Sequence, residues 1–227
     1  MAITRGSFYN SGGYGSAATF DMTATVSSGQ ALVVGVIAKI GRTVSGVVWD
    51  QGGAGESLSL AGSQPDTSGG GTYKVWLYYH LSPTAGTSKT IRVTQDTGDT
   101  IDAMAWTYSG HGTSAIGNTG TNHSASNGSS DYSFSATAGT ANSFIVSFLF
   151  DQNAGIAVST GLTSIGTGFF ANCLAADSGA VTGAQTLHAT TPGTFQWVAT
   201  AWFELKEAGG GGGGTVGAPF FRQIAGF

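Results

Sequence analysis

Two apolar runs give the strongest structural signal in the chain. Residues 30–40 (QALVVGVIAKI) and 143–150 (SFIVSFLF) are almost continuously hydrophobic. Runs of this kind, rich in valine, isoleucine and phenylalanine, predict strands that are buried on both faces. Residues 195–206 (FQWVATAWFELK) have a similar character. We expect all three segments to be central strands of a sheet.

Other segments alternate between apolar and polar residues. Residues 57–61 (SLSLA), 90–95 (TIRVTQ) and 72–81 (TYKVWLYYHL) repeat with a period of two, which is typical of strands. Helical stripes of apolar residues are scarce, so the sequence predicts an all-β protein. Within 72–81 the alternation places one set of side chains on each face: Tyr73, Val75, Leu77 and Tyr79 on the first, and Lys74, Trp76, Tyr78 and His80 on the second.

Glycine- and serine-rich turns separate the predicted strands. Many short strands at such spacing are typical of a sandwich or barrel. Strands that alternate with helices would predict a parallel sheet, and the sequence lacks that pattern. We therefore expect a single antiparallel β-sandwich over residues 16–207, built from two sheets and jelly-roll-like. Residues 110–130, mostly Gly, Ser, Thr, Asn and His, are predicted to be a loop. Residues 1–15 are predicted to be an N-terminal arm that pairs either with its own sheet or with a neighbour's.

Four motifs follow one another within residues 30–206. They are Val48-Trp49-Asp50, Leu58-Ser59-Leu60, the stretch from Trp76 to Val93 with Pro83 and Gly86, and Tyr108-Ser109-Gly110. In this order they resemble a phage-associated and bacterial β-sandwich family found in virion structural proteins and non-catalytic surface modules. The motifs are signatures of packing and turns, since Pro83 and Gly86 set a bend between two strands. The resemblance implies a sandwich fold and a non-catalytic role.

Residues 208–227 differ from the rest of the chain. Six consecutive glycines, Gly209 to Gly214, precede a short apolar peptide. Such a glycine run forms a flexible tether, and burying one large apolar side chain gains about 1.5–3 kcal/mol. We therefore predict a linker followed by an anchor that binds a neighbouring subunit. The predicted anchor residues are Pro219, Phe220, Phe221, Ile224 and Phe227.

Composition and charge exclude several classes of protein. Charged residues make up only 9% of the chain, hydrophobic residues 41%, and the net charge is −4. Low charge with a large apolar fraction predicts a folded protein, and the acidic balance argues against nucleic-acid binding. No segment approaches the ~20 apolar residues that span a bilayer, and the N-terminus lacks a signal-peptide pattern. We expect no membrane partner, and we expect synthesis in a host cytoplasm followed by incorporation into a virion.

The residues that usually carry chemistry form no recognisable motif. His80, His111, His123 and His188 match no metal-ligand spacing, and no nucleophile elbow or phosphate loop is present. Cys173, in an apolar stretch, is predicted to be a buried thiol. We predict no catalytic residue, no metal and no cofactor. A calcium site in the group Asp96, Asp99 and Asp102 stays an open alternative, although turn roles explain the first two.

Two functions fit this sequence. The first is a structural subunit of a phage virion, such as a capsid decoration, head-fibre or tail-associated protein, that forms a homo-oligomer and contacts other virion proteins. The alternative is a carbohydrate-binding module that attaches to a host glycan through exposed aromatic rings. Trp76 and Tyr78 are the candidates for that platform. Aromatic residues within apolar strands usually pack in a core or an interface, which is the main interpretation of these rings.

Overall fold

The computed structural model describes residues 1–65, 72–125, 129–152, 155–168, 172–194 and 197–209. All regular structure in these ranges is β-strand, and all strand pairs are antiparallel, as the sequence predicts. The strands are β1 (Thr4–Asn10), β2 (Thr19–Val26), β3 (Ala31–Lys39), β4 (Val44–Trp49), β5 (Glu56–Ser57), β6 (Ser59–Pro65), β7 (Tyr73–His80), β8 (Gly86–Gln95), β9 (Ile101–Ser109), β10 (His111–Ala125), β11 (Asp131–Asp151), β12 (Ala157–Val158), β13 (Thr163–Thr167), β14 (Cys173–Thr190) and β15 (Trp197–Glu207).

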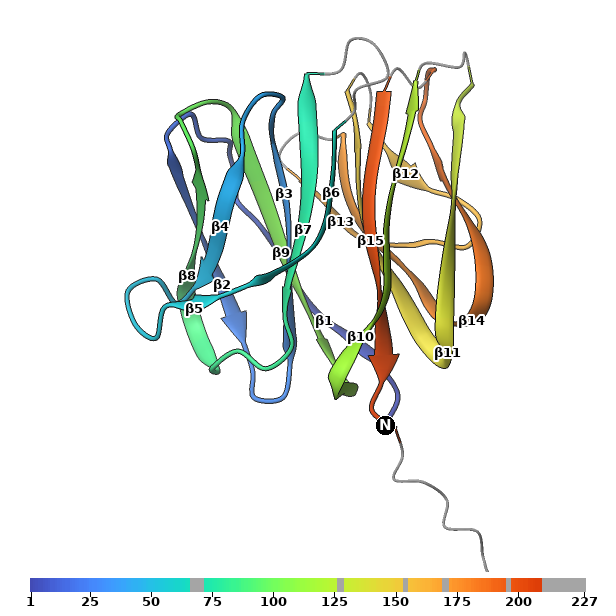
Figure 1. Cartoon of the computed structure of the whole chain (residues 1–227), viewed down its shortest axis with the longest axis horizontal. Helices are drawn as coiled ribbons and strands as arrows, with labels where there is room; N and C mark the ends of the chain where they lie inside the picture. Colours follow the sequence, from blue (N-terminus) through green and yellow to red (C-terminus); the bar gives the residue numbers. More distant parts are fainter. Residues whose placement is uncertain (66–71, 126–128, 153–154, 169–171, 195–196, 210–227) are drawn as a thin grey trace, which may run out of the picture.

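The strands form three sheets rather than the two expected from the sequence. The middle sheet has the order β1-β9-β3-β7-β6. The small sheet, β2-β8-β4-β5, packs on one face of it, and the large sheet, β10-β15-β11-β14-β12 with β13 added to β14, packs on the other (Figure 1). The three segments predicted to be central are interior strands: β3 in the middle sheet, and β11 and β15 in the large one.

The middle sheet is buried on both faces, which explains its apolar sequence. In β3, Val33 and Ile37 pack toward the large sheet, whereas Leu32 and Val34 pack toward the small sheet. Each of these four side chains is at most 1% exposed. A strand with cover on both faces needs apolar residues at every position, and this removes the usual alternation.

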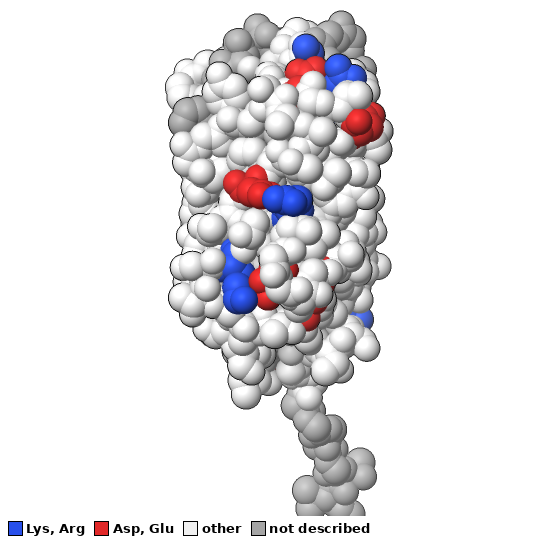
Figure 2. Space-filling model, turned by 90° about the vertical axis from the view of Figure 1, so that its left-hand side faces the viewer, with Lys and Arg blue, Asp and Glu red and all other residues white. Residues whose placement is uncertain are grey.

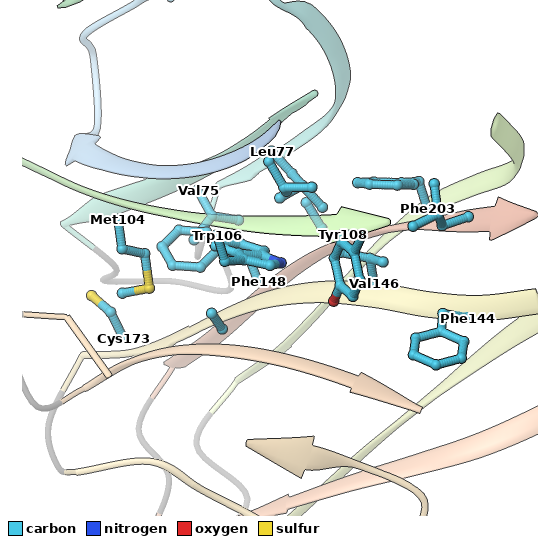
Figure 3. Close-up of a cluster of buried hydrophobic side chains, with 14 of the residues drawn as sticks. Val75, Leu77, Met104, Trp106, Tyr108, Phe144, Val146, Phe148, Cys173 and Phe203 are labelled. Carbon is cyan, nitrogen blue, oxygen red and sulfur yellow. The ribbon is translucent and has the colours of Figure 1, made fainter. Parts of the chain in front are cut away.

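The core between the middle and large sheets is rich in aromatic rings (Figure 3). Trp106 of β9 meets Phe148 of β11 with ring centroids 6.5 Å apart. Gly35 of β3 leaves room for Phe148, because a Cβ at this glycine would lie 2.6 Å from the Phe148 ring. Such close packing joins the two sheets into one body.

Strands β11 and β14 form a long ribbon that folds back over the large sheet. They stay paired from Asp131 to Phe150, with register shifts near the middle. Yet Tyr132, at the start of β11, accepts a 3.1 Å hydrogen bond from Thr200 of β15, whose partner in the sheet is Leu149. A straight strand at about 3.3 Å per residue would hold Tyr132 and Leu149 tens of ångströms apart. The first half of β11 therefore covers the outer face of the second half, and a third core cluster fills the space between them.

A buried carboxylate holds the bend of this ribbon. Glu204 of β15 is 1% exposed, and its carboxylate accepts backbone N–H bonds from Asn118 (3.1 Å) and Thr140 (2.8 Å). Burial alone would raise the pKa of Glu204, but the donors around it outweigh burial and the pKa is lowered. A Cβ at Gly117 would lie 2.0 Å from this carboxylate, so the approach of β10 requires glycine there.

The predicted loop at residues 110–130 is wrong over most of its length. His111–Ala125 forms β10, which pairs with β15. Its residues are small because bulky neighbours fill the space: a Cβ at Gly120 would lie 2.5 Å from the indole of Trp202. The same strand contacts β6, where Gln64 and His123 are joined by a 3.1 Å hydrogen bond.

Candidate functional site

The first and last described segments of the chain meet at one end of the molecule, which we name the tail pole (Figure 1). The backbone N–H of Ala208 donates to the carbonyl of Gly110 (2.9 Å), and the amino group of Met1 donates to the carbonyl of Ala208 (3.1 Å). The Met1 amino group also lies 3.4 Å from the Glu207 carboxylate. The chain is therefore hydrogen-bonded up to Ala208, one residue before the glycine run.

A small apolar pocket opens at the tail pole, and we name it the terminal pocket. Its volume is about 350 Å³. Ile3 and Phe144, which are 6% and 7% exposed, give it apolar walls, and Glu207 contributes one carboxylate. The remaining lining residues are Ala2, Asn142 and Ala180. The pocket thus combines an apolar surface with one carboxylate, which is paired with the Met1 amino group, directly beside the residue from which the tail departs.

An ion-paired network holds the wall of this pocket. Arg5 of β1 donates through Nε to Asp177 of β14 (2.8 Å), and Tyr108 of β9 donates its hydroxyl to the same carboxylate (2.8 Å). The Arg5 guanidinium also lies over the Phe144 ring, 5.6 Å from its centroid. Burial and the negative charge of Asp177 raise the pKa of Tyr108 well above its ordinary value, so the phenol stays protonated and keeps donating.

The sequence leaves two possible partners for the N-terminal arm, its own sheet or a neighbour's. The N-terminal arm pairs with its own sheet, because β1 lies along β9 and Gly15 forms a bridge with Ile101. Asn10 adds a side-chain hydrogen bond to the carbonyl of Thr167 in β13. The arm therefore closes the edge between the middle and large sheets.

A second, more open pocket of about 290 Å³ lies at the end of β7, and we name it the serine pocket. Its lining residues are Ser57, Ser59, Tyr79, His80, Leu81 and Ser82. The Tyr79 ring packs against Phe203, 5.5 Å between centroids. The Nδ1 atom of His80 accepts the N–H of Ser82 (3.2 Å), so the neutral ring carries its proton on Nε2. The pocket therefore presents hydroxyls, a ring N–H donor and an apolar surface, which suits a neutral polyhydroxylated ligand.

Trp76 and Tyr78 do not form an exposed platform. They are 2% and 5% exposed, and they belong to the core between the middle and small sheets. The Tyr78 hydroxyl donates to the carbonyl of Val44 (3.2 Å), and burial raises the pKa of Tyr78 to about 12. The glycan platform at these two residues is therefore wrong, whereas their interpretation as core residues is confirmed. The small sheet covers this face of β7, and no local pattern in the sequence indicates that cover.

The other predicted site residues divide into two groups. The anchor residues Pro219, Phe220, Phe221, Ile224 and Phe227 lie outside the described residues, so the anchor stays a prediction. Cys173 is confirmed as a buried thiol, and burial raises its pKa well above the usual value.

The acidic residues Asp99 and Asp102 have protein partners. Asp99 accepts hydrogen bonds from Arg42 (3.1 Å), and Asp102 accepts one from the Ser11 hydroxyl (2.7 Å). Among the described residues, no group of three His, Cys, Asp or Glu side chains could hold a metal ion. Within the same ranges there is also no helix long and apolar enough to span a membrane.

Charges on the outer face of the small sheet occur in pairs. Asp21 accepts a 2.7 Å hydrogen bond from Arg92, which lowers its pKa, and Lys89 lies 3.2 Å from Asp50. Figure 2 shows positive groups beside negative ones, separated by uncharged surface. Cross-strand threonines, such as Thr23 opposite Thr90, occupy positions between them. This face is therefore nearly neutral and rich in hydroxyls.

Comparisons with protein-family models, curated proteins and solved structures found no match. The similarity to phage-associated sandwiches stays a prediction that rests on the motifs alone.

Proposed function

We propose that the protein is a non-catalytic structural subunit of a phage virion, in the class of capsid decoration, head-fibre or tail-associated proteins. It assembles through its sandwich and through the C-terminal anchor. One observation carries the proposal. Strand β15 lies between β10 and β11, so both of its edges are paired up to the tail pole. The apolar peptide after the glycine run is therefore not required to complete this sheet.

The tail has the composition of a tethered binding segment. Residues 216–227 contain three phenylalanines and one isoleucine, and six glycines precede them. A relaxed chain of six glycines spans roughly 13 Å. Tethering raises the local concentration of the peptide near any neighbour, so even a weak contact is occupied.

The surface of the sandwich suits close packing of copies. The outer face of the small sheet is nearly neutral, and on the opposite side of the molecule Ser133 pairs with His188 and Ser135 with Thr186. The charged groups on these faces lie in pairs, such as Arg92 with Asp21 and His188 with Asp131, and a paired charge costs less to bury than an isolated one. This supports a subunit that packs among many neighbours.

Truncation tests this function. A chain that ends at Gly209 keeps the hydrogen bonds of Ala208, so we expect its free energy of unfolding to change by less than about 0.5 kcal/mol. We expect it to lose self-association in light scattering and to disappear from density-gradient fractions that contain virus particles. Replacing Phe220, Phe221, Ile224 and Phe227 by serine is the control of equal length and should behave in the same way. Unchanged assembly of either variant would show that the tail is not the anchor.

Carbohydrate binding stays a second candidate, now at the serine pocket. Three serine hydroxyls, the His80 donor and the partly buried Tyr79 ring offer hydrogen bonds and an apolar surface to a sugar. We expect saturable binding in a glycan screen that is lost in Ser59→Trp, which fills the pocket. Ser45→Trp, exposed on β4, is the matched control and should bind normally. If no glycan binds, or if both variants bind equally, this candidate is wrong.

A further inference from the structure

We propose that the terminal pocket receives the anchor peptide, residues 216–227, of a second copy of this chain. This inference rests on the proposed function and adds the receptor for the anchor. The tail pole is then an interface between two copies, and each subunit inserts its anchor peptide into the terminal pocket of the other.

The chemistry of the pocket matches the peptide. Ile3, Phe144, Ala2 and Ala180 present apolar atoms to a space of about 350 Å³. This volume is near the lower end of the range for ligand pockets, about 300–1,000 Å³, and suits one or two large side chains. The peptide carries adjacent phenylalanines, Phe220 and Phe221, followed at once by Arg222. The Glu207 carboxylate, which the Met1 amino group approaches to 3.4 Å, lies beside the apolar walls and has a second oxygen that would accept a hydrogen bond from that arginine.

The walls of the pocket are held in place before any peptide arrives. The Phe144 ring meets the edge of Tyr108, 6.1 Å between centroids, and lies under the Arg5 guanidinium. Asp177, fully buried, fixes both partners through hydrogen bonds. A preformed pocket binds a peptide with little loss of side-chain freedom on the receptor side.

The direction of β15 favours a second copy over the chain's own pocket. The strand runs toward the tail pole, and Ala208 continues its line by donating to the carbonyl of Gly110 and accepting from the Met1 amino group (Figure 1). A return to the pocket beside Glu207 would require the chain to turn back within the first residues of the glycine run, whereas a facing copy requires no such turn. The twelve residues from Gly209 to Phe220 span about 17–21 Å when relaxed and about 40 Å when extended. A copy whose tail pole faces this one within that distance is therefore within reach of the anchor.

The pocket lies next to Ala208, where the tail begins, and this arrangement also determines the symmetry of the oligomer. When two tail poles face each other, Ala208 of each copy, where its tail begins, lies opposite the pocket of the other copy. Each copy can then insert its anchor peptide into the other. A reciprocal exchange closes on itself and does not propagate into a filament. We therefore expect a closed oligomer whose symmetry axis passes near the tail pole.

Blocking the pocket gives the first test. Ala180 is exposed and pairs with Phe144, so Ala180→Trp fills the pocket with little effect on the core. We expect at least a tenfold weaker self-association by sedimentation equilibrium. Ala184→Trp, exposed on the same strand but outside the pocket, is the matched control and should associate normally. If Ala180→Trp proves unstable, Glu207→Arg should weaken association as well, and Arg222→Glu in the same chain should restore it.

Mixing two defective chains gives the decisive test. Ala180→Trp keeps its tail but has a blocked pocket, whereas the chain that ends at Gly209 keeps its pocket but has no tail. Each should be monomeric alone, and a 1:1 mixture should form a heterodimer. A mixture that stays monomeric, or an Ala180→Trp chain that still associates, would overturn the pocket as receptor. If truncation abolishes association while Ala180→Trp does not, the proposed function survives and only this inference fails.

Discussion

The hydroxyl of Tyr108 donates a 2.8 Å hydrogen bond to Asp177, and this contact joins the middle sheet to the large sheet inside the core. Hydrogen bonds to charged groups contribute about 1.5–3 kcal/mol. We expect Tyr108→Phe to lower the free energy of unfolding by this amount in urea titrations. Tyr9→Phe is the control, since the Tyr9 hydroxyl donates to the neutral carbonyl of Thr25 and its loss should cost about 1 kcal/mol. Equal losses would show that the charge of Asp177 adds nothing.

The buried carboxylate of Glu204 should make stability depend on pH. Its pKa is lowered in the folded state, so its stabilising effect is present above the unfolded pKa of about 4.3 and is lost as pH falls through the folded pKa. We expect Glu204→Gln to be less stable by about 1–3 kcal/mol at pH 7. The difference from the wild type should shrink at pH 3, as measured by urea unfolding at both pH values. A constant difference would mean that the ionised form has no special role.

The close approach of Gly35 and Phe148 predicts a penalty for one added methyl group. The nearest ring atom would lie 2.6 Å from a Cβ at residue 35, within a fully buried core. We expect Gly35→Ala to cost about 1–3 kcal/mol and to lower the melting temperature in calorimetry. Gly46→Ala in β4 is the matched control, because no heavy atom lies within 4 Å of its added Cβ. A neutral Gly35→Ala would mean that the two sheets can move apart without cost.

The single thiol of the chain should report on global unfolding. Cys173 is fully buried against Met104, and burial raises its pKa, which suppresses the reactive thiolate. We expect almost no reaction with a disulfide reagent at pH 8 in buffer, and one equivalent in denaturant. The rate should rise with urea in parallel with the loss of tryptophan fluorescence signal. Rapid labelling of the native protein would contradict the burial of this residue.

The sequence predicted the fold class because burial leaves a local signal. The apolar run at 30–40 became β3, the centre of the middle sheet, and β11 and β15 also lie in the interior of their sheet. The number of sheets had no such signal. Large rings occur on both faces of β7, with Trp76 and Tyr78 on one face, and alternation alone does not show which face another sheet covers.

Two further features of the structure could not be predicted from local sequence patterns. Strand β10 has few large apolar residues because Trp202 fills the space over Gly120, so its sequence has the composition of a loop. The ion pair of Arg5 with Asp177 joins residues 172 positions apart, and nothing near either residue indicates the other. Both pockets are also built from distant segments, so no local pattern in the sequence indicated either of them.

The position of β15 between β10 and β11 has a consequence for biosynthesis. Both neighbours leave the ribosome before β15 does, and only β15 fills the space between them in the sheet. A nascent chain that ends before Trp197 therefore leaves one edge of β10 and one edge of β11 unpaired. Such open edges are templates for intermolecular pairing. Prematurely terminated chains should aggregate, and solubility should appear only when translation has passed Glu207.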